Sequence, residues 1–202
     1  MKINFACISP HPPIILPSVG SEEERKEVEE TISSLEKLGK IFDQSEIDEI
    51  IISSPHPDWG FNVPLFFIAK NFKGKIETYL TESPSPEFSL QPGKSMITKM
   101  EDKNYALIAS GDLSHKLKED GPYGFHPQGP KFDKALITFL KDKNIDKIKK
   151  LNKDFPEAGE CGLRSFCFLL GILEEAKIEW EPEILSYQDS FGVGYLVTNF
   201  KI

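Results

Sequence analysis

Residues 105–115, YALIASGDLSH, decide the fold, because five apolar residues run directly into a polar turn. A short, continuously apolar segment that ends at turn residues is typical of a strand buried on both faces of a parallel sheet. Ser110, Gly111 and Asp112 are residue types that form turns, so His115 follows closely behind the end of this predicted strand.

Two other segments repeat this arrangement. Residues 3–8 predict a short buried strand that ends in a proline-rich turn containing His11, and residues 46–52 predict another, which ends before a loop containing His56. Ligands of α/β sheets bind at the carboxyl ends of the strands. A single histidine at such a place is most often a hydrogen-bonded structural residue, but three of the chain's four histidines favour a shared site.

Helical patterns alternate with the strands. Ser21 and Glu24 form a capping-box pattern, and the predicted helices cover residues 28–38, 132–141, 145–151 and 163–173. The last helix is apolar nearly all round and therefore belongs to the core. Residues 183–187 and 193–200 predict a terminal hairpin, in which the segment Gly192–Tyr195 forms a structural turn rather than a phosphate loop.

Together these patterns predict an α/β fold. We expect a single domain over residues 1–202, a sandwich with a mostly parallel central sheet, helices on both faces and an antiparallel C-terminal hairpin. Residues 64–79 predict one or two further strands, and the prolines at 84, 86 and 92 predict an irregular connection.

The long segment of residues 116–130 has no helical or strand periodicity. A connection of this length in a compact domain is usually functional, and its aromatic residues favour an ordered lid over the site. We therefore expect Tyr123, Phe125 and His126 to face the pocket.

The composition restricts the classes of binding partner and the cellular compartment that we expect for this protein. The 202 residues include 32 acidic and 24 basic side chains, which gives a net charge of −8 and argues against nucleic acid and anionic membranes as partners. The three cysteines are odd in number and lack C-x-x-C spacing, as is typical of a reducing compartment. No apolar run is long enough for a signal peptide or a membrane span, so we expect a cytoplasmic protein.

The histidines need a carboxylate to complete a metal site. Two neutral imidazoles and one carboxylate form a ligand set that holds non-haem Fe(II) with open positions. Glu160 is the best-placed acid, because it lies in a glycine-flanked turn before the apolar helix. Two alternatives stay open: Glu160 can satisfy the dipole at the start of that helix, and Cys161 is a competing soft ligand beside it. G-x-S-x-G and H-E-x-x-H, the commonest hydrolase and zinc-protease strings, are absent.

Five short motifs occur in an order that resembles a known superfamily. They are SPHPP at residues 9–13, SPHP at 54–57, SGDLSH at 110–115, GECG at 159–162 and FGVGY at 191–195. In this order they resemble the class III extradiol ring-cleavage dioxygenase B-subunit superfamily. That superfamily contains the catalytic subunit of protocatechuate 4,5-dioxygenase and the Memo-like proteins, and the resemblance spans almost the whole chain.

The resemblance implies an Fe(II)-dependent extradiol dioxygenase that cleaves a catechol-type aromatic ring with dioxygen. His11, His56 and Glu160 correspond to the metal ligands, although another divalent metal such as Zn can occupy such a site in isolated protein. His115 corresponds to the acid/base residue, and Asp112 either orients His115 or caps its turn. The expected partners are a small aromatic diol and dioxygen.

A second function is compatible with the same resemblance. The chain is shorter than usual members of the superfamily, so a homo-oligomer or a second subunit could supply part of the pocket. Memo-like relatives share the fold without an established ring-cleavage role, and they have a cysteine where this chain has Cys161. The alternative is therefore a Memo-like metal-binding or redox-interaction protein.

Overall fold

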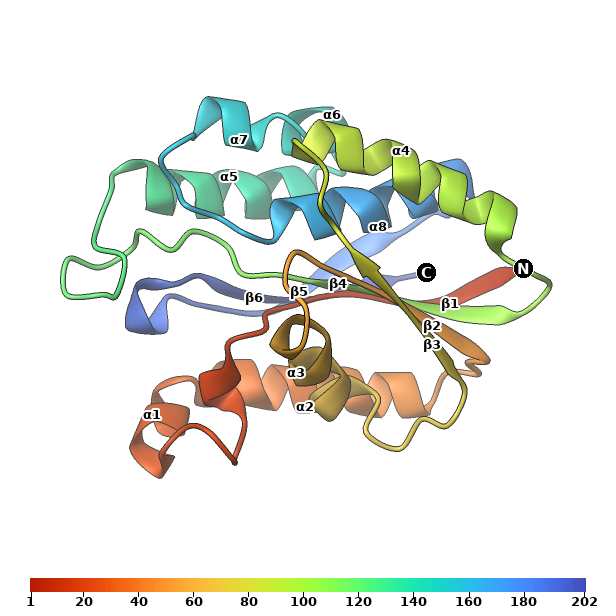
Figure 1. Cartoon of the computed structure of the whole chain (residues 1–202), viewed down its shortest axis with the longest axis horizontal. Helices are drawn as coiled ribbons and strands as arrows, with labels where there is room; N and C mark the ends of the chain where they lie inside the picture. Colours follow the sequence, from red (N-terminus) through yellow and green to blue (C-terminus); the bar gives the residue numbers. More distant parts are fainter.

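The computed structural model describes residues 1–202, which are built around one six-stranded sheet (Figure 1). The strand order is β3-β2-β4-β1-β6-β5; the first four strands are parallel to one another, and β6 is antiparallel to both β1 and β5. The predicted α/β fold with a C-terminal antiparallel hairpin is confirmed. The strands are β1 (Lys2–Ser9), β2 (Glu49–Ser54), β3 (Lys75–Leu80), β4 (Asn104–Ser110), β5 (Glu181–Gln188) and β6 (Tyr195–Lys201).

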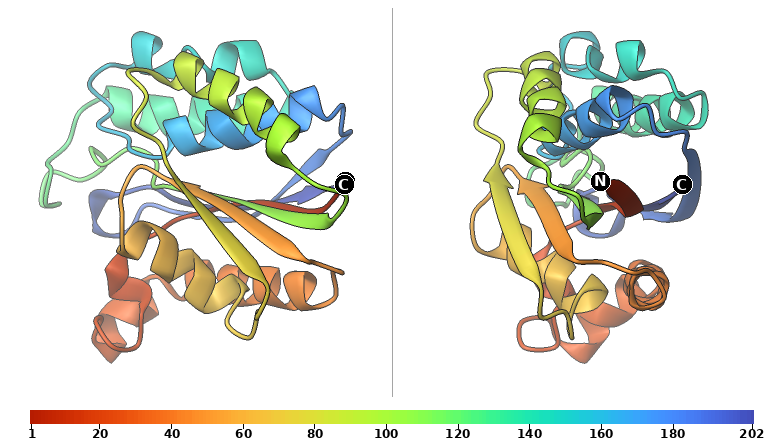
Figure 2. Two further views of the ribbon diagram at one scale, coloured as in Figure 1. Left: turned by 45° about the vertical axis from the view of Figure 1, so that its right-hand side comes forward. Right: turned by 90° about the vertical axis from the view of Figure 1, so that its right-hand side faces the viewer.

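Helices cover both faces of the sheet, as Figure 2 shows from two further directions. One face carries α1 (Glu22–Glu27), α2 (Glu29–Asp43) and α3 (Trp59–Ile68). The other carries α4 (Pro86–Met96), α5 (Gln128–Lys141), α6 (Ile145–Ile148), α7 (Leu151–Asp154) and α8 (Leu163–Glu175). Short 3-10 turns are η1 (Pro13–Ile15), η2 (Ile97–Lys99) and η3 (Ser190–Gly192). Every helix is too short or too polar to cross a lipid bilayer.

The sheet separates two hydrophobic cores, because successive residues of a strand point to opposite faces. In β4, Leu107 packs into the core under α4–α8, and the next residue, Ile108, packs into the core against α2 and α3. All six residues of β2 are buried. Burial on both faces explains why these strands are continuously apolar rather than alternating.

The predicted N-terminal helix forms in two pieces. Ser21 caps α1 through the expected capping box, in which its hydroxyl accepts from the Glu24 N–H. The chain then leaves helical geometry at Val28 (φ −115°), so α1 and α2 are separate helices. The apolar face of α2 still packs on the sheet as expected.

Of two predictions about the middle of the chain, one holds in part and the other is wrong. The first part of residues 64–79 lies in α3, and only β3 is a strand; residues 86–96 form α4 rather than an irregular connection. Pro86 occupies the first turn of α4, where a proline costs no hydrogen bond. Close packing on α8 compensates for Pro92 inside the helix: a Cβ at Gly93 would collide with the Phe168 carbonyl, and one at Gly171 with the Leu90 carbonyl. Tertiary packing here overrides local propensity.

Candidate active site

Three parallel strands end at one edge of the sheet, and each leads to a histidine. The end of β1 leads to His11, that of β2 to His56, and that of β4 to His115. The three strands are neighbours in the order β2-β4-β1, so the loops that follow them converge. The three histidines line one pocket, as expected, and the ring centroids of His11 and His56 are 5.3 Å apart.

Hydrogen bonds determine which nitrogen of His11 is free. The Ser110 hydroxyl donates its only proton to the Gly60 carbonyl, and it lies 2.9 Å from His11 Nδ1. It must therefore accept a proton from Nδ1, which leaves the lone pair of the neutral ring on Nε2. Burial and the nearby His56 lower the pKa of His11 to about 3, so the ring stays neutral. Nε2 of His11 is therefore available as a metal ligand.

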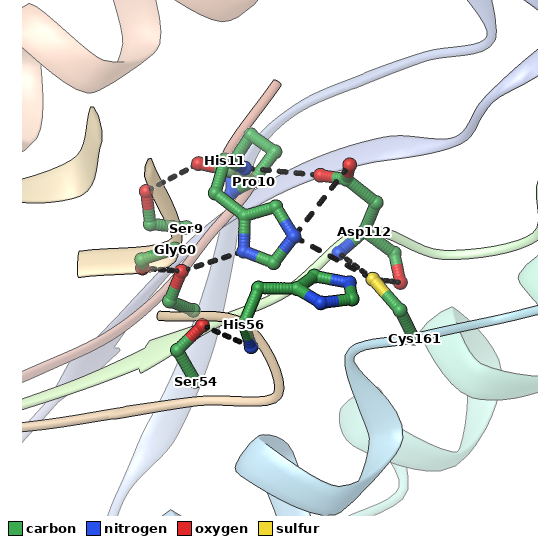
Figure 3. Close-up of polar contacts among 9 residues, drawn as sticks. Ser9, Pro10, His11, Ser54, His56, Gly60, Asp112 and Cys161 are labelled. Atoms are coloured by element: carbon green, nitrogen blue, oxygen red, sulfur yellow. Dashed lines mark hydrogen bonds and ion pairs between the residues drawn. The ribbon is translucent and has the colours of Figure 1, made fainter. Parts of the chain in front are cut away.

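Cys161 lies beside this free nitrogen. Its Sγ is 3.6 Å from His11 Nε2, and it accepts a hydrogen bond from the Asp112 N–H (Figure 3). His11, His56 and Cys161 each offer one ligand atom, and these atoms lie within 4.8 Å of one another. Burial raises the pKa of the Cys161 thiol, so metal binding through this sulfur would release a proton. The arrangement is compact enough for one ion.

Glu160 has a different environment. Its Oε2 accepts a hydrogen bond of 2.7 Å from the Leu163 N–H at the start of α8, and burial raises the pKa of the carboxyl. Neither group of closely spaced ligand atoms includes it. In this arrangement Glu160 provides an acceptor for a backbone N–H that has no partner within the first turn of α8. Its role as a metal ligand stays a prediction that requires the side chain to turn away from Leu163.

Asp112 holds the backbone of His11. Its Oδ1 accepts from the His11 N–H at 3.0 Å, and its Oδ2 lies 3.9 Å from His11 Nε2. Burial raises the pKa of Asp112 to about 6. Ligand atoms of Asp112, His115 and Cys161 also lie within 4.8 Å of one another. The observed hydrogen bond of the carboxylate therefore orients His11, while the predicted orientation of His115 by Asp112 rests on proximity.

His115 is neutral and partly unpartnered. Its Nε2 is buried and has no hydrogen-bond partner within the chain. Burial lowers the pKa of the imidazole, although the nearby Asp112 opposes that effect. Buried polar atoms normally have partners, so an orphaned nitrogen beside a pocket is suited to a ligand or a transferred proton.

The pocket has a volume of about 480 Å³, within the usual range of small-molecule sites. The predicted lid contributes Pro122 and Tyr123, whose ring lies 5.0 Å from that of His115. Phe125 is 46% exposed and is not part of the lining, and His126 Nδ1 accepts from the Gln128 N–H. Tyr123 is therefore placed as expected, whereas the expectation for Phe125 and His126 is wrong. An isolated antiparallel bridge between Leu117 and Phe125 closes the lid into a narrow loop.

Comparison with known proteins identifies the family. The family described as "Catalytic LigB subunit of aromatic ring-opening dioxygenase" matches residues 44–198, which is most of the chain and contains His56, Asp112, His115 and Cys161. The chain belongs to this LigB family. It is also 33% identical to Protein CA_C1420 of Clostridium acetobutylicum over an alignment that covers all of this chain and 58% of that protein. The chain thus spans less than two thirds of that relative's length.

A solved structure has a similar fold. The uncharacterized protein JW3007 of Escherichia coli K12 superposes with a TM-score of 0.65, covering 98% of this chain and 100% of that one. Their sequence identity is 13%, so this likeness concerns the fold alone. LigB dioxygenases are generally metal-dependent, and the cluster around His11 and His56 offers donor types that fit a transition metal.

Two residues that line the pocket of this LigB chain, Trp59 and Tyr195, were not predicted from the sequence. Trp59 lies in the pocket with its ring 5.8 Å from that of His56, and Tyr195 lines the same pocket from the start of β6. Trp59 follows His56 closely in sequence, which was a usable signal. Tyr195 was assigned to a structural turn. It is the first residue of β6, which is antiparallel to β1 and therefore begins at the edge of the sheet where β1 ends.

Proposed function

We propose that this chain is an Fe(II)-dependent extradiol dioxygenase that opens the ring of a catechol-type substrate with dioxygen. The observation that carries the proposal is the convergence of three imidazoles on one aromatic-walled pocket. Membership of the LigB family supports the reaction class. The pocket size supports a small planar substrate.

His11 and His56 would hold the metal, with Glu160 or Cys161 as the third ligand. The free Nε2 of His11, fixed by Ser110, supports this assignment. Ferrous iron, when bound, supplies a Lewis acid for the substrate oxygens and the redox chemistry for dioxygen. The protein itself holds the donors in place and walls the pocket with aromatic residues.

His115 would act as the acid/base residue. Its orphaned Nε2 can accept a proton from a substrate hydroxyl and return it later in the reaction, because its lowered pKa keeps the ring neutral. Tyr123 covers His115 on the side of the lid. Nε2 of His115 is itself buried, which limits the access of water to the transferred proton.

Cys161 favours a second candidate function, a Memo-like metal-binding or redox-interaction protein. Its sulfur, not the Glu160 carboxylate, lies beside the free nitrogen of His11. A ligand set with a thiolate is softer than two histidines and a carboxylate, and it suits zinc or copper better than Fe(II) oxygenase chemistry. The identity of the third ligand therefore separates the two candidates.

The experiment that tests ring cleavage is anaerobic reconstitution with Fe(II), followed by air and a panel of catechols. We expect a yellow ring-opened product and matching uptake of dioxygen. The His115→Phe variant should keep its iron and lose roughly 10²- to 10⁴-fold in rate. Iron-loaded protein that consumes no dioxygen with any catechol would contradict the proposal and favour the second candidate.

The third ligand is tested by Glu160→Gln and Cys161→Ser, two adjacent substitutions of nearly unchanged volume. Elemental analysis after loading with Fe(II) and, separately, with Zn(II) reports the metal content of each variant. Loss of iron in Glu160→Gln alone supports the dioxygenase ligand set. Loss of metal in Cys161→Ser alone assigns the sulfur and supports the second candidate.

A further inference from the structure

Tyr195 is placed at the site by the direction of its strand. It is the first residue of β6, which runs antiparallel to β1, so the start of β6 lies at the edge where β1 ends. Its side chain is only 3% exposed and lines the same pocket as His11, His56 and His115.

The hydroxyl of Tyr195 has no hydrogen-bond partner within the chain. Two other tyrosines differ: the hydroxyl of half-buried Tyr187 donates to Asp133, and the hydroxyl of buried Tyr105 accepts from the Glu101 N–H. A buried phenol without a partner costs free energy unless a ligand or a water satisfies it. Because Tyr195 lines the pocket, a ligand bound there can supply the missing partner.

The surroundings of Tyr195 determine what kind of partner it can take. Burial raises its pKa, and the nearby Asp112 and Tyr123 raise it further, so the hydroxyl stays protonated and acts as a donor. Val193 and Phe191 provide apolar lining on the same segment. A hydroxyl donor next to apolar side chains suits a ligand that carries an oxygen acceptor on a flat, largely apolar ring.

We propose that Tyr195 is a substrate-binding residue whose hydroxyl donates a hydrogen bond to an oxygen of an aromatic diol in this pocket. The class of ligand rests on the proposed function; the position of the donor rests on the geometry of Tyr195. The hydrogen bond favours the ionised form of the substrate oxygen, because charge-assisted bonds are the stronger ones.

The test compares Tyr195→Phe with Tyr79→Phe, which removes a hydroxyl from a tyrosine that stacks on Phe168 outside the pocket. The probe is 4-nitrocatechol, titrated anaerobically into Fe(II)-loaded protein and followed by its absorption spectrum. We expect Tyr195→Phe to bind the probe about tenfold or more weakly, and Tyr79→Phe to bind it like the wild type. Metal content and thermal unfolding should be unchanged in both variants.

Three results would overturn the inference. Equal affinity of wild type and Tyr195→Phe would overturn it and leave the proposed function intact. Loss of metal in Tyr195→Phe would also overturn it, because Tyr195 would then support the metal site instead of the ligand. Absence of probe binding to the wild type would overturn the aromatic-diol function together with this inference.

Discussion

The free nitrogen of His11 depends on one hydroxyl proton. Because the Gly60 carbonyl can only accept, it takes the proton of Ser110, and Ser110 must then accept from His11 Nδ1. Without that acceptor, the ring could rotate or place its proton on the nitrogen that would bind the metal. Outer hydrogen bonds of this kind set the tautomer and orientation of metal-binding histidines.

We expect Ser110→Ala to weaken metal binding by roughly 10- to 100-fold, because His11 loses the partner that fixes its tautomer. The affinity is measured by competition with a chelator of known strength. Ser9→Ala is the matched control, since this buried serine ends the neighbouring strand and donates to the Pro10 carbonyl. Unchanged affinity in Ser110→Ala would contradict the role given to this hydroxyl.

The choice between Glu160 and Cys161 shows where sequence-based prediction ended. The GECG segment marked the correct turn, and both residues were candidates. Which side chain faces the histidines depends on how the turn docks on the loop after β4, where the Asp112 carbonyl accepts from the Cys161 and Gly162 N–H groups. That docking involves residues far apart in the chain, so no local pattern could reveal it.

At the scale of elements, Pro64 links the shape of α3 to the site. A proline has no N–H, so the Gly60 carbonyl lacks its usual helical partner four residues later. That carbonyl is therefore free to accept the Ser110 proton. Residues 64–79 were predicted as one or two strands; the structure instead places Pro64 in α3, where it leaves free a carbonyl that the site uses.

Close contact between two glycines brings the loop after β4 against the turn before α8. A Cβ at Gly111 would collide with the Gly162 backbone. We expect Gly111→Ala to destabilise the fold by about 1–3 kcal/mol and to weaken metal binding, because Asp112 and Cys161 would move apart. Urea unfolding and chelator competition measure the two effects.

Gly171→Ala is the control for Gly111→Ala. Its Cβ would collide with the Leu90 carbonyl between α8 and α4, far from the histidines. We expect a similar loss of stability with unchanged metal affinity. If both variants weakened metal binding equally, the effect of Gly111→Ala would be global and not specific to the site.

Asp133 of α5 supports the loop that carries His115. Its Oδ1 accepts from the Ser114 N–H at 2.9 Å, and its Oδ2 accepts from the Tyr187 hydroxyl at 2.7 Å. Burial raises the pKa of Asp133 to about 7, despite these bonds, and Asp189 adds to the rise. A buried carboxyl thus joins α5, β5 and the loop after β4.

The raised pKa of Asp133 predicts a pH-dependent stability. A carboxyl that holds its proton more tightly in the folded state stabilises the fold at low pH, and this contribution is lost as the pH rises from about 4 to about 7. Asp133→Asn removes this titration and keeps the side-chain shape. We expect the stability of the wild type relative to Asp133→Asn to fall across that range, measured by urea unfolding. Parallel profiles would show that Asp133 ionises as freely in the native state as in the unfolded chain.

At the scale of the whole molecule, the site joins parts of the chain that lie far apart in sequence. His11, His56 and Cys161 follow or precede different elements, and the sheet that separates the two hydrophobic cores ends beneath them. The alternation of strands and helices predicted this edge, because parallel strands share one carboxyl end. A bound ion would therefore link the N-terminal, central and C-terminal parts of the fold.

Metal binding should stabilise the whole chain, because the three donors come together only in the folded state. An ion present at one hundred times its dissociation constant contributes about 2.7 kcal/mol, which corresponds to a rise in Tm of roughly 5–11 °C for a chain of this size. We expect anaerobic Fe(II), and Zn(II) in parallel, to produce this rise in the wild type and a chelator to reverse it. His56→Ala should show no rise. His126→Ala is the matched control, because the fourth histidine lies outside the pocket lining and should leave the rise intact. An equal rise in His56→Ala would place the stabilising ion elsewhere on the molecule.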